Sequence, residues 1–274
     1  MIARPLLSPL HKQQLQIAQQ ELRAGKAQAS ADRLRHILSG GLMHADVIYL
    51  LALASHALGA LPDARQSLNV AINLDPDNAL FWTVLVKILD EQGDVMAAVV
   101  AKRRLCDLQP MVGPHWAALG FACLRVGQSA EAEEALRRAL ELMPDDLPVR
   151  HNLAIALRTQ DKPQEARAEL APVLAASAPH PASIALDAHL LGDLGDLAAA
   201  ADGYRALLAR EPAMLDAHDA LARLLPTMGE GDAALDAYHT ALAQMPDDVA
   251  LWRNAVGSAR AIKHYPQLLE WSET

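Results

Sequence analysis

The stretch "ALELMPDD" at residues 139–146 recurs almost unchanged as "ALAQMPDD" at residues 241–248. The two copies lie 102 residues apart, which is three times 34. The prolines in phase with this spacing are Pro76, Pro110, Pro144, Pro212 and Pro246. A proline ends a helix because it lacks the backbone N–H and restricts the residue before it. The spacing therefore predicts a repeating unit with this period, and each copy of the unit ends at a forced break.

Glycines and alanines repeat with the same period. The glycines are Gly25, Gly59, Gly93, Gly127, Gly195 and Gly229, and the alanines are Ala64, Ala98, Ala132, Ala166, Ala200 and Ala234. A glycine suits the left-handed residue after a helix, and a residue that stays small indicates close helix–helix contact. Each unit is predicted to be a helix, a glycine turn, a second helix and a proline turn.

The composition favours an all-α fold. Hydrophobic residues make up 52% of the 274 residues but aromatic residues only 4%, and alanine and leucine, which favour helices, predominate. The net charge of −9 argues against a nucleic-acid-binding face, and the densest basic stretch, "AKRR" around Arg103, is predicted to be a solvated helix face. Cys106 and Cys123 are predicted to be small buried apolar residues.

No targeting or membrane segment is evident in the sequence. The first residues, "MIARPLLSPLHKQQ", contain two prolines and lack the apolar core of a signal peptide. The longest apolar stretch, "VIYLLALASHALGAL", is too short to span a bilayer. We therefore predict a soluble cytoplasmic protein with no membrane partner.

The unit at residues 113–146 resembles the tetratricopeptide repeat pattern W-x₂-L-G-x₂-Y, A-x₃-F and P. Its matching residues are Trp116, Leu119, Gly120, Ala132, Ala139 and Pro144, while Cys123 and Leu136 replace the aromatic residues. The resemblance implies a right-handed α-solenoid of antiparallel helix pairs. We expect an extension over residues 1–10, then one array over residues 11–274. That array would hold seven 34-residue repeats from 11 to 248, of which the first is a polar cap, and a partial eighth at 249–274.

Five residues depart from the pattern. The glycine position is Asp161, the proline position is Ala178, and Pro172 falls inside a second helix, so residues 160–182 are predicted to be the least regular part of the array. Pro226 is likewise expected to disturb a first helix. In addition, Asp187 stands where other repeats have an apolar residue, which predicts either a nearby donor or a rotated helix.

Two histidine-containing stretches have the spacing of metal ligands. "HAD" at residues 44–46 has the H-x-D spacing of iron(II) oxygenases, but it falls at a predicted turn rather than on a β-scaffold. In "DAHD" at residues 216–219, adjacent helical residues diverge around the helix axis. No nucleophile or phosphate-binding motif is present in the sequence. We predict no metal site, no cofactor and no catalytic residue, and hence no enzyme.

The resemblance implies that the first helices of successive repeats line a concave groove. The predicted groove residues are Tyr49, Lys87, Phe121, Arg125, His151, Asn152, Arg158, His189, Arg223 and Arg253. Asn152 and Asn254 each follow a groove residue, and their amides are suited to pairing with an extended peptide backbone.

Two functions remain open from the sequence. The first is a scaffold that binds a protein or peptide segment in the groove. The alternative is the recognition array of a larger enzyme, because similar bacterial arrays precede 2-oxoglutarate/iron(II) oxygenase, sulfotransferase or glycosyltransferase domains. The identity of the partner and the oligomeric state are not predicted.

Overall fold

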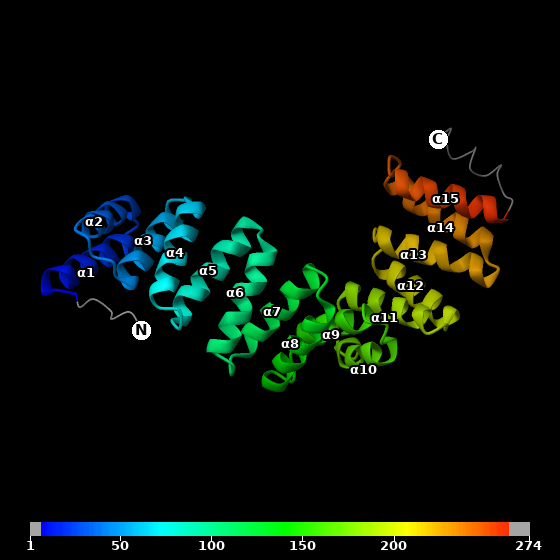
Figure 1. Cartoon of the computed structure of the whole chain (residues 1–274). Coiled ribbons are helices and arrows are strands. Elements are labelled where there is room, and N and C mark those ends of the chain that lie inside the picture. The colour runs from blue at the N-terminus through cyan, green and yellow to red at the C-terminus, as the bar shows by residue number, and fades with distance from the viewer. Residues whose placement is uncertain (1–6, 263–274) are drawn as a thin grey trace. The chain divides into compact units, whose positions relative to one another are not determined.

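A computed structural model describes residues 7–262, which form helices and connecting turns without a β-strand (Figure 1). The helices are α1 (Pro9–Arg23), α2 (Ala27–Ser39), α3 (Ala45–Ala57), α4 (Leu61–Leu74), α5 (Ala79–Gln92), α6 (Val95–Leu108), α7 (Gly113–Arg125), α8 (Ser129–Leu142), α9 (Leu147–Arg158), α10 (Pro163–Leu174), α11 (Pro181–Asp193), α12 (Leu197–Arg210), α13 (Leu215–Leu224), the 3₁₀ helix η1 (Leu225–Met228), α14 (Gly231–Gln244) and α15 (Val249–Ile262).

The predicted period sets where the helices begin. From α3 onward the first helices start at this constant spacing, at Ala45, Ala79, Gly113, Leu147, Pro181, Leu215 and Val249. The second helices start with the same spacing, at Ala27, Leu61, Val95, Ser129, Pro163, Leu197 and Gly231. Each first helix from α1 to α13 contacts the second helix of its repeat. The fold is therefore an all-α solenoid of antiparallel helix pairs, as predicted.

The first helix begins earlier than the predicted repeat boundary. The hydroxyl of Ser8 accepts a hydrogen bond from the backbone N–H of His11 at 3.2 Å, and Pro9 occupies the first helical position. Both features favour a helix start, because a proline there loses no hydrogen bond. The last two residues of the predicted extension over 1–10 thus belong to α1.

The turn between the two helices of a repeat survives the loss of its glycine. Gly127 has a φ of 75°, in the left-handed region, and Asp161 takes the same conformation with a φ of 60°. Aspartate tolerates this region better than most residues. The turn at Asp161 therefore keeps the geometry of the glycine turns.

The prolines inside helices change helix length. Helices α8 and α12 end two periods apart, at Leu142 and Arg210, which would place the end of α10 midway, at residue 176, but α10 ends at Leu174 just after Pro172. Helix α13 ends at Leu224, and Pro226 lies in η1. Pro62, Pro148 and Pro163 lie at the starts of their helices, where a proline is tolerated, whereas Pro266 lies outside the described residues. The prediction that residues 160–182 are the least regular part of the array stays a prediction.

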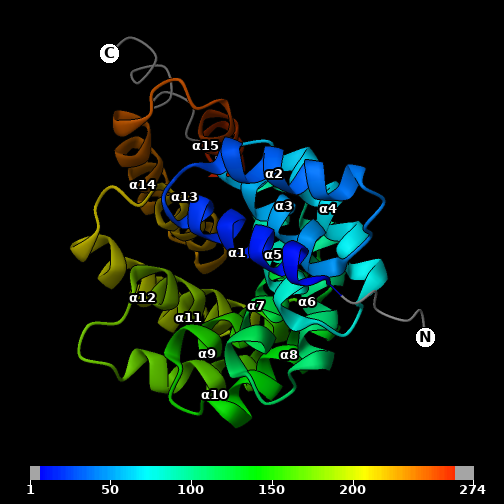
Figure 2. The same ribbon diagram turned by 90° about the vertical axis from the view of Figure 1, so that its left-hand side faces the viewer.

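The chain separates into two compact units, residues 1–144 and 145–274. In the first unit, buried clusters lie among α1 to α3 and among α3 to α6, and in the second unit one lies among α11 to α15. The six periodic alanines are fully buried in both units, which confirms that they mark close helix contacts. Within the second unit, the helix pairs α9/α10 and α11/α12 lie side by side (Figure 2). The predicted single array over residues 11–274 stays a prediction.

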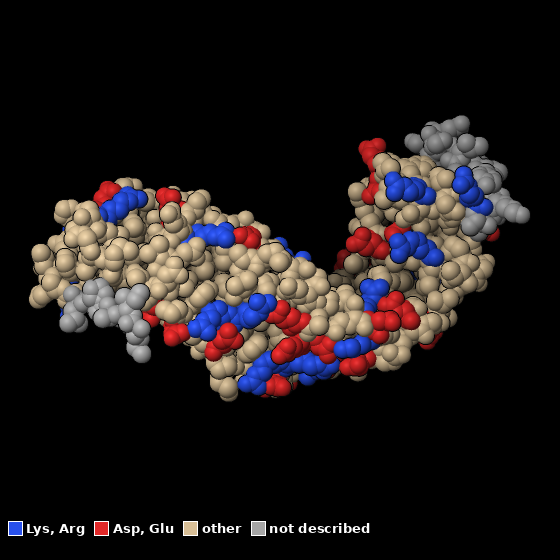
Figure 3. All heavy atoms as spheres, viewed as in Figure 1, with Lys and Arg blue, Asp and Glu red and all other residues tan. Residues whose placement is uncertain are grey.

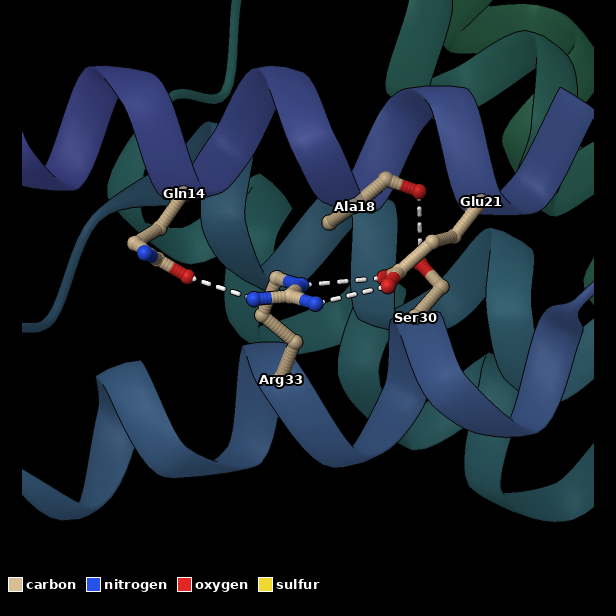
Figure 4. A network of polar contacts seen from close by, with 5 residues as sticks. All are labelled: Gln14, Ala18, Glu21, Ser30 and Arg33. Atoms are coloured by element: carbon tan, nitrogen blue, oxygen red, sulfur yellow. Dashed lines mark hydrogen bonds and ion pairs between the residues drawn. The ribbon is translucent and has the colours of Figure 1, made fainter.

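Helices α1 and α2 are joined by polar contacts (Figure 4). The guanidinium of Arg33 donates to both carboxylate oxygens of Glu21, at 3.0 and 2.6 Å, and to Gln14 at 2.7 Å. The fully buried hydroxyl of Ser30 donates to the backbone oxygen of Ala18 at 2.9 Å. These bonds connect two helices whose sequence is more polar than that of the later repeats.

This network predicts a pH dependence of stability. The hydrogen bonds from Arg33 hold the pKa of Glu21 below its usual value. A lowered pKa in the folded protein means that the ion pair stabilises the fold at neutral pH and that this contribution is lost as the pH falls through the folded-state pKa. We expect Glu21→Gln to be less stable than the parent protein at neutral pH and equally stable in acid, in urea unfolding at a series of pH values.

The control is Glu134→Gln, which removes an exposed carboxylate with no ion pair among the described residues. The difference in the free energy of unfolding between this variant and the parent protein should be the same at every pH. A Glu21→Gln defect that persists unchanged in acid would mean that the ion pair is not its cause.

The basic stretch around Arg103 is only partly the solvated face predicted from the sequence, since Arg103 is exposed but Lys102 is buried. Lys102 is only 8% exposed, and its ammonium donates to Asp90 at 2.7 Å. Arg103 donates two hydrogen bonds to Glu131, at 2.7 and 2.8 Å. The prediction is wrong for Lys102 because this residue occupies the position that Leu68 and Leu136 hold in neighbouring repeats, which faces the interior.

The cysteine prediction is confirmed. Cys106 and Cys123 are fully buried free thiols. Burial raises the pKa of Cys106 to about 12 and that of Cys123 to about 11, so both stay protonated at neutral pH. They therefore behave as small apolar core residues.

Candidate functional site

The first helices of the second unit form the surface that carries most of the predicted groove residues. Helix α9 contacts α11, and α13 contacts α15. Three cavities lie along these helices, and we call the surface that they form the first-helix face. Six predicted groove residues line the cavities, namely His151, Asn152, Arg158, His189, Arg223 and Arg253.

The largest cavity, about 430 Å³, lies between α9, the end of α10 and the start of α11. It exists where α10 stops early, since residues 176–180 follow an irregular path across its edge. Seven of its eleven lining residues are leucine, valine, proline or alanine. Its volume falls in the range of about 300–1,000 Å³ that is typical of ligand sites.

Four polar residues line this first cavity. The ring Nδ1 of His151 and the hydroxyl of Ser183 share a hydrogen bond of 2.9 Å. Burial lowers the pKa of His151, and the nearby His180 lowers it further, so this ring is neutral at pH 7. The side-chain amide of Asn152 makes no hydrogen bond within the described residues. Asn152 therefore offers a donor and an acceptor to a ligand in the cavity.

The second and third cavities occupy equivalent places in successive repeats. The second, about 330 Å³, lies between α11 and α13 beside Tyr204, and the third, about 250 Å³, lies between α13 and α15 beside Tyr238. These tyrosines are one period apart on second helices, and burial raises the pKa of both. The cavities thus recur with the repeat, one for each step along the array.

Arginines line both of these cavities. In the second, Arg158 donates to Asp193 at 2.6 Å, while the side chain of Arg223 is 67% exposed and lies 3.6 Å from Asp219. Arg253, in the third, makes no ion pair within the described residues.

Two further polar residues, Asn254 and Ser258, line the third cavity. Asn254 donates to Asp219 at 2.9 Å, and the buried hydroxyl of Ser258 has no hydrogen-bond partner among the described residues. Together the two cavities are lined by three arginines and one aspartate, in a chain whose net charge is −9. Elsewhere, on the face seen in Figure 3, basic and acidic side chains alternate rather than gather by sign.

The four other predicted groove residues lie in the first unit. Tyr49 is partly buried, with its ring 4.8 Å from that of Phe81, and burial raises its pKa. The ammonium of Lys87 lies 3.9 Å from the carboxylate of Glu91. Phe121 is 50% exposed, and Arg125 is exposed on the same helix. The predicted convergence of Phe121 and Arg125 with residues of the second unit stays a prediction.

The histidine-containing stretches have structural roles. His44 caps α3, since its ring Nδ1 accepts the backbone N–H of Asp46 at 3.2 Å. His218 is buried, and its Nε2 bonds to the backbone oxygen of Pro212 at 2.9 Å. Among residues 7–262, no three His, Cys, Asp or Glu side chains are grouped as metal ligands. Asp187 stands where other repeats have an apolar residue, and its carboxylate accepts a hydrogen bond from Arg167 at 2.8 Å.

Sequence reasoning missed the two tyrosines of the first-helix face. Tyr204 and Tyr238 lie on second helices, whereas all the predicted groove residues lie on first helices. A signal was present in the sequence, because leucine stands at the same repeat position in Leu136 and Leu170. Apart from the buried Lys102, the earlier repeats have leucine at this position, so two successive tyrosines distinguish the repeats whose second helices border these cavities.

Helical pairs that repeat with a constant period and stack through buried alanines define an α-solenoid repeat protein. Profiles of the tetratricopeptide repeat match residues 15–79 and 124–190. The chain belongs to the tetratricopeptide repeat proteins. No curated protein gives a significant match to the sequence.

Solved structures share the fold. The C-terminal part of a TPR repeat-containing protein from Cytophaga hutchinsonii has a TM-score of 0.65 at 13% identity, over 88% of this chain and 98% of that one. The structure of Naa15/Naa10 bound to HypK-THB has a TM-score of 0.58 at 16% identity, over 91% of this chain and 39% of that one. The APC/C hetero-tetramer Cut9-Hcn1 has a TM-score of 0.55 at 17% identity, over 91% of this chain and 48% of that one. This chain thus spans less than half of each of the last two.

Among the described helices, none has both the length and the apolar character needed to cross a membrane.

Proposed function

We propose that this protein is an interaction scaffold that binds an extended segment of a partner protein along its first-helix face. The observation that carries the proposal is the row of three cavities in the second unit, which are lined by six of the predicted groove residues. A row of hollows separated by one repeat suits an extended chain, whose side chains enter successive pockets while its backbone pairs with polar groups between them.

The structural neighbours support a role in assemblies. The solved structures named for Naa15/Naa10 with HypK-THB and for Cut9-Hcn1 are complexes of more than one protein. The alternative, a recognition array for an enzyme, gains no support from these comparisons and stays a sequence-based prediction.

The proposal is tested with a displayed library of random peptides selected on the full chain. Peptides that survive selection are measured by fluorescence anisotropy against the parent protein, Asn152→Ala and Arg158→Ala. Both variants should weaken binding. They should change the free energy of unfolding by about 1 kcal/mol or less, because Asn152 has no side-chain partner among the described residues and Arg158 forms a half-exposed ion pair.

The matched control is Arg210→Ala, which removes an exposed arginine from the second helix α12. It should leave peptide binding unchanged. If Arg210→Ala weakens binding as much as Arg158→Ala does, the peptides are held by general charge or by the second helices, and the first-helix face is not the site.

A further inference from the structure

The spacing of the three cavities sets a register for a bound segment. Successive cavities are separated by one first helix, and packed helices lie about 8–10 Å apart. An extended peptide rises about 3.3 Å per residue. The second and third cavities share Arg223, so the step between them corresponds to about three residues of an extended chain lying across the helices. The first cavity lies near the start of α11 and the second near its end, about 12 Å further along the helix, so this oblique step corresponds to about four to five residues.

The chemistry changes along that row. The first cavity is mostly apolar and carries the unbonded amide of Asn152 at its side. The second and third are lined by Arg158, Arg223 and Arg253. Asp193 is already held by Arg158, and Asp219 accepts a hydrogen bond from Asn254, so both carboxylates have partners of their own. Arg253 makes no ion pair among the described residues, and Arg223 is 67% exposed and pairs with Asp219 only at 3.6 Å, so both arginines can meet negative charge on a ligand.

We propose that the partner segment carries one large aliphatic or aromatic side chain and, on one side of it along the chain, acidic side chains about four to five and about seven to eight residues away. This inference rests on the proposed function and specifies the ligand of the same face. The apolar side chain enters the cavity between α9 and α11, and the amide of Asn152 pairs with the segment's backbone beside it. The acidic side chains then lie over Arg223 and Arg253.

The two kinds of contact contribute differently. Burying a large apolar side chain supplies most of the affinity, so its loss should weaken binding at least about tenfold. Exposed arginine–carboxylate pairs are individually weak, so the loss of each should weaken binding only about two- to fivefold. The arginines therefore select the register and direction of the segment, while the cavity anchors it.

Selection from the random library tests the register directly. The expected result is enrichment of an apolar residue that lies about four to five and about seven to eight residues from acidic ones, in one chain direction. Three synthetic peptides of equal composition then quantify it, namely GSFGSGEGSEGS, its order-reversed form GSEGSEGSGFGS and the misspaced GSFEEGSGSGSG. One of the first two should bind best, and the misspaced peptide should bind more weakly than that one.

Variants of the protein test each position. Ala178 is exposed in the loop that lines the first cavity, so Ala178→Phe should fill the cavity and weaken binding of the best peptide at least about tenfold. Ala175→Phe is the matched control, since Ala175 is exposed nearby but does not line the cavity. Arg223→Gln and Arg253→Gln should each weaken binding about two- to fivefold, whereas Arg210→Gln should not.

The possible outcomes separate this inference from the function on which it rests. Selected peptides that lose affinity with Arg158→Ala but show no such spacing would overturn the inference and leave the proposed function standing. Equal binding of the spaced and misspaced peptides, or full binding by Ala178→Phe, would overturn it as well. If no selected peptide responds to any variant of the first-helix face, both proposals fail.

Discussion

Replacing Phe81 by alanine is expected to lower the free energy of unfolding by about 3–5 kcal/mol. Phe81 lies in α5, is only 1% exposed, and packs among buried residues of α3, α4 and α5 in the first unit. Its ring also lies 4.8 Å from that of Tyr49. Truncation removes the buried ring and leaves a cavity that the surrounding helices can close only in part. Urea or thermal unfolding measures the loss.

The chain provides its own control, because it contains only two phenylalanines. Phe121 is 50% exposed on the first helix α7, so Phe121→Ala removes the same side chain from a surface position. It should change stability by about 0.5 kcal/mol or less. Comparable losses for the two variants would contradict the packing described for α5, and would show that Phe121 is structural rather than available to a partner.

Replacing Gly120 by valine is expected to cost about 3 kcal/mol for the opposite reason, overpacking. A Cβ atom at Gly120 would lie 2.5 Å from Cγ and 2.8 Å from Cδ2 of Leu136, and 3.2 Å from the backbone oxygen of Ala132. Leu136 is fully buried in α8, so it cannot move aside. Helices α7 and α8 must separate to accept the new side chain, and unfolding at increasing urea concentration reports the cost.

Two further variants show whether the close approach is the cause. Leu136→Ala removes the atoms that clash, so the double variant with Gly120→Val should be more stable than the sum of the two single losses implies. Gly257→Val inserts the same side chain into α15, where an added Cβ meets no atom within 4 Å. This substitution should leave the free energy of unfolding nearly unchanged. Additive losses in the double variant would show that the clash with Leu136 is not responsible.

Much of the fold could be predicted from the sequence because its signals are local. Prolines and glycines act on their own backbone and the residue beside it, so their spacing predicted the helix starts and turns. The repeated alanines predicted the close contacts, since a small side chain is needed wherever two helices meet. Even Asp161, which breaks the glycine pattern, takes the left-handed conformation that the pattern requires.

The candidate site could be predicted only in part. The first-helix positions of His151, Asn152 and Arg158 follow from the repeat, and all three line cavities in the second unit. The pattern could not show that Tyr49 packs against Phe81, nor that Tyr204 borders the second cavity. Those outcomes depend on how far each side chain reaches between neighbouring helices.

By itself the sequence determined the period, the all-α class, the helix starts and the burial of small residues at the crossings. Only the tertiary structure decided that Arg158 on α9 pairs with Asp193 on α11, and that Lys102 turns inward to Asp90. It also decided that the early end of α10 opens a cavity beside Asn152. The physical reason is that a repeat specifies the backbone of each unit through local rules, whereas ion pairs and cavities arise from side chains of different units brought within a few ångströms.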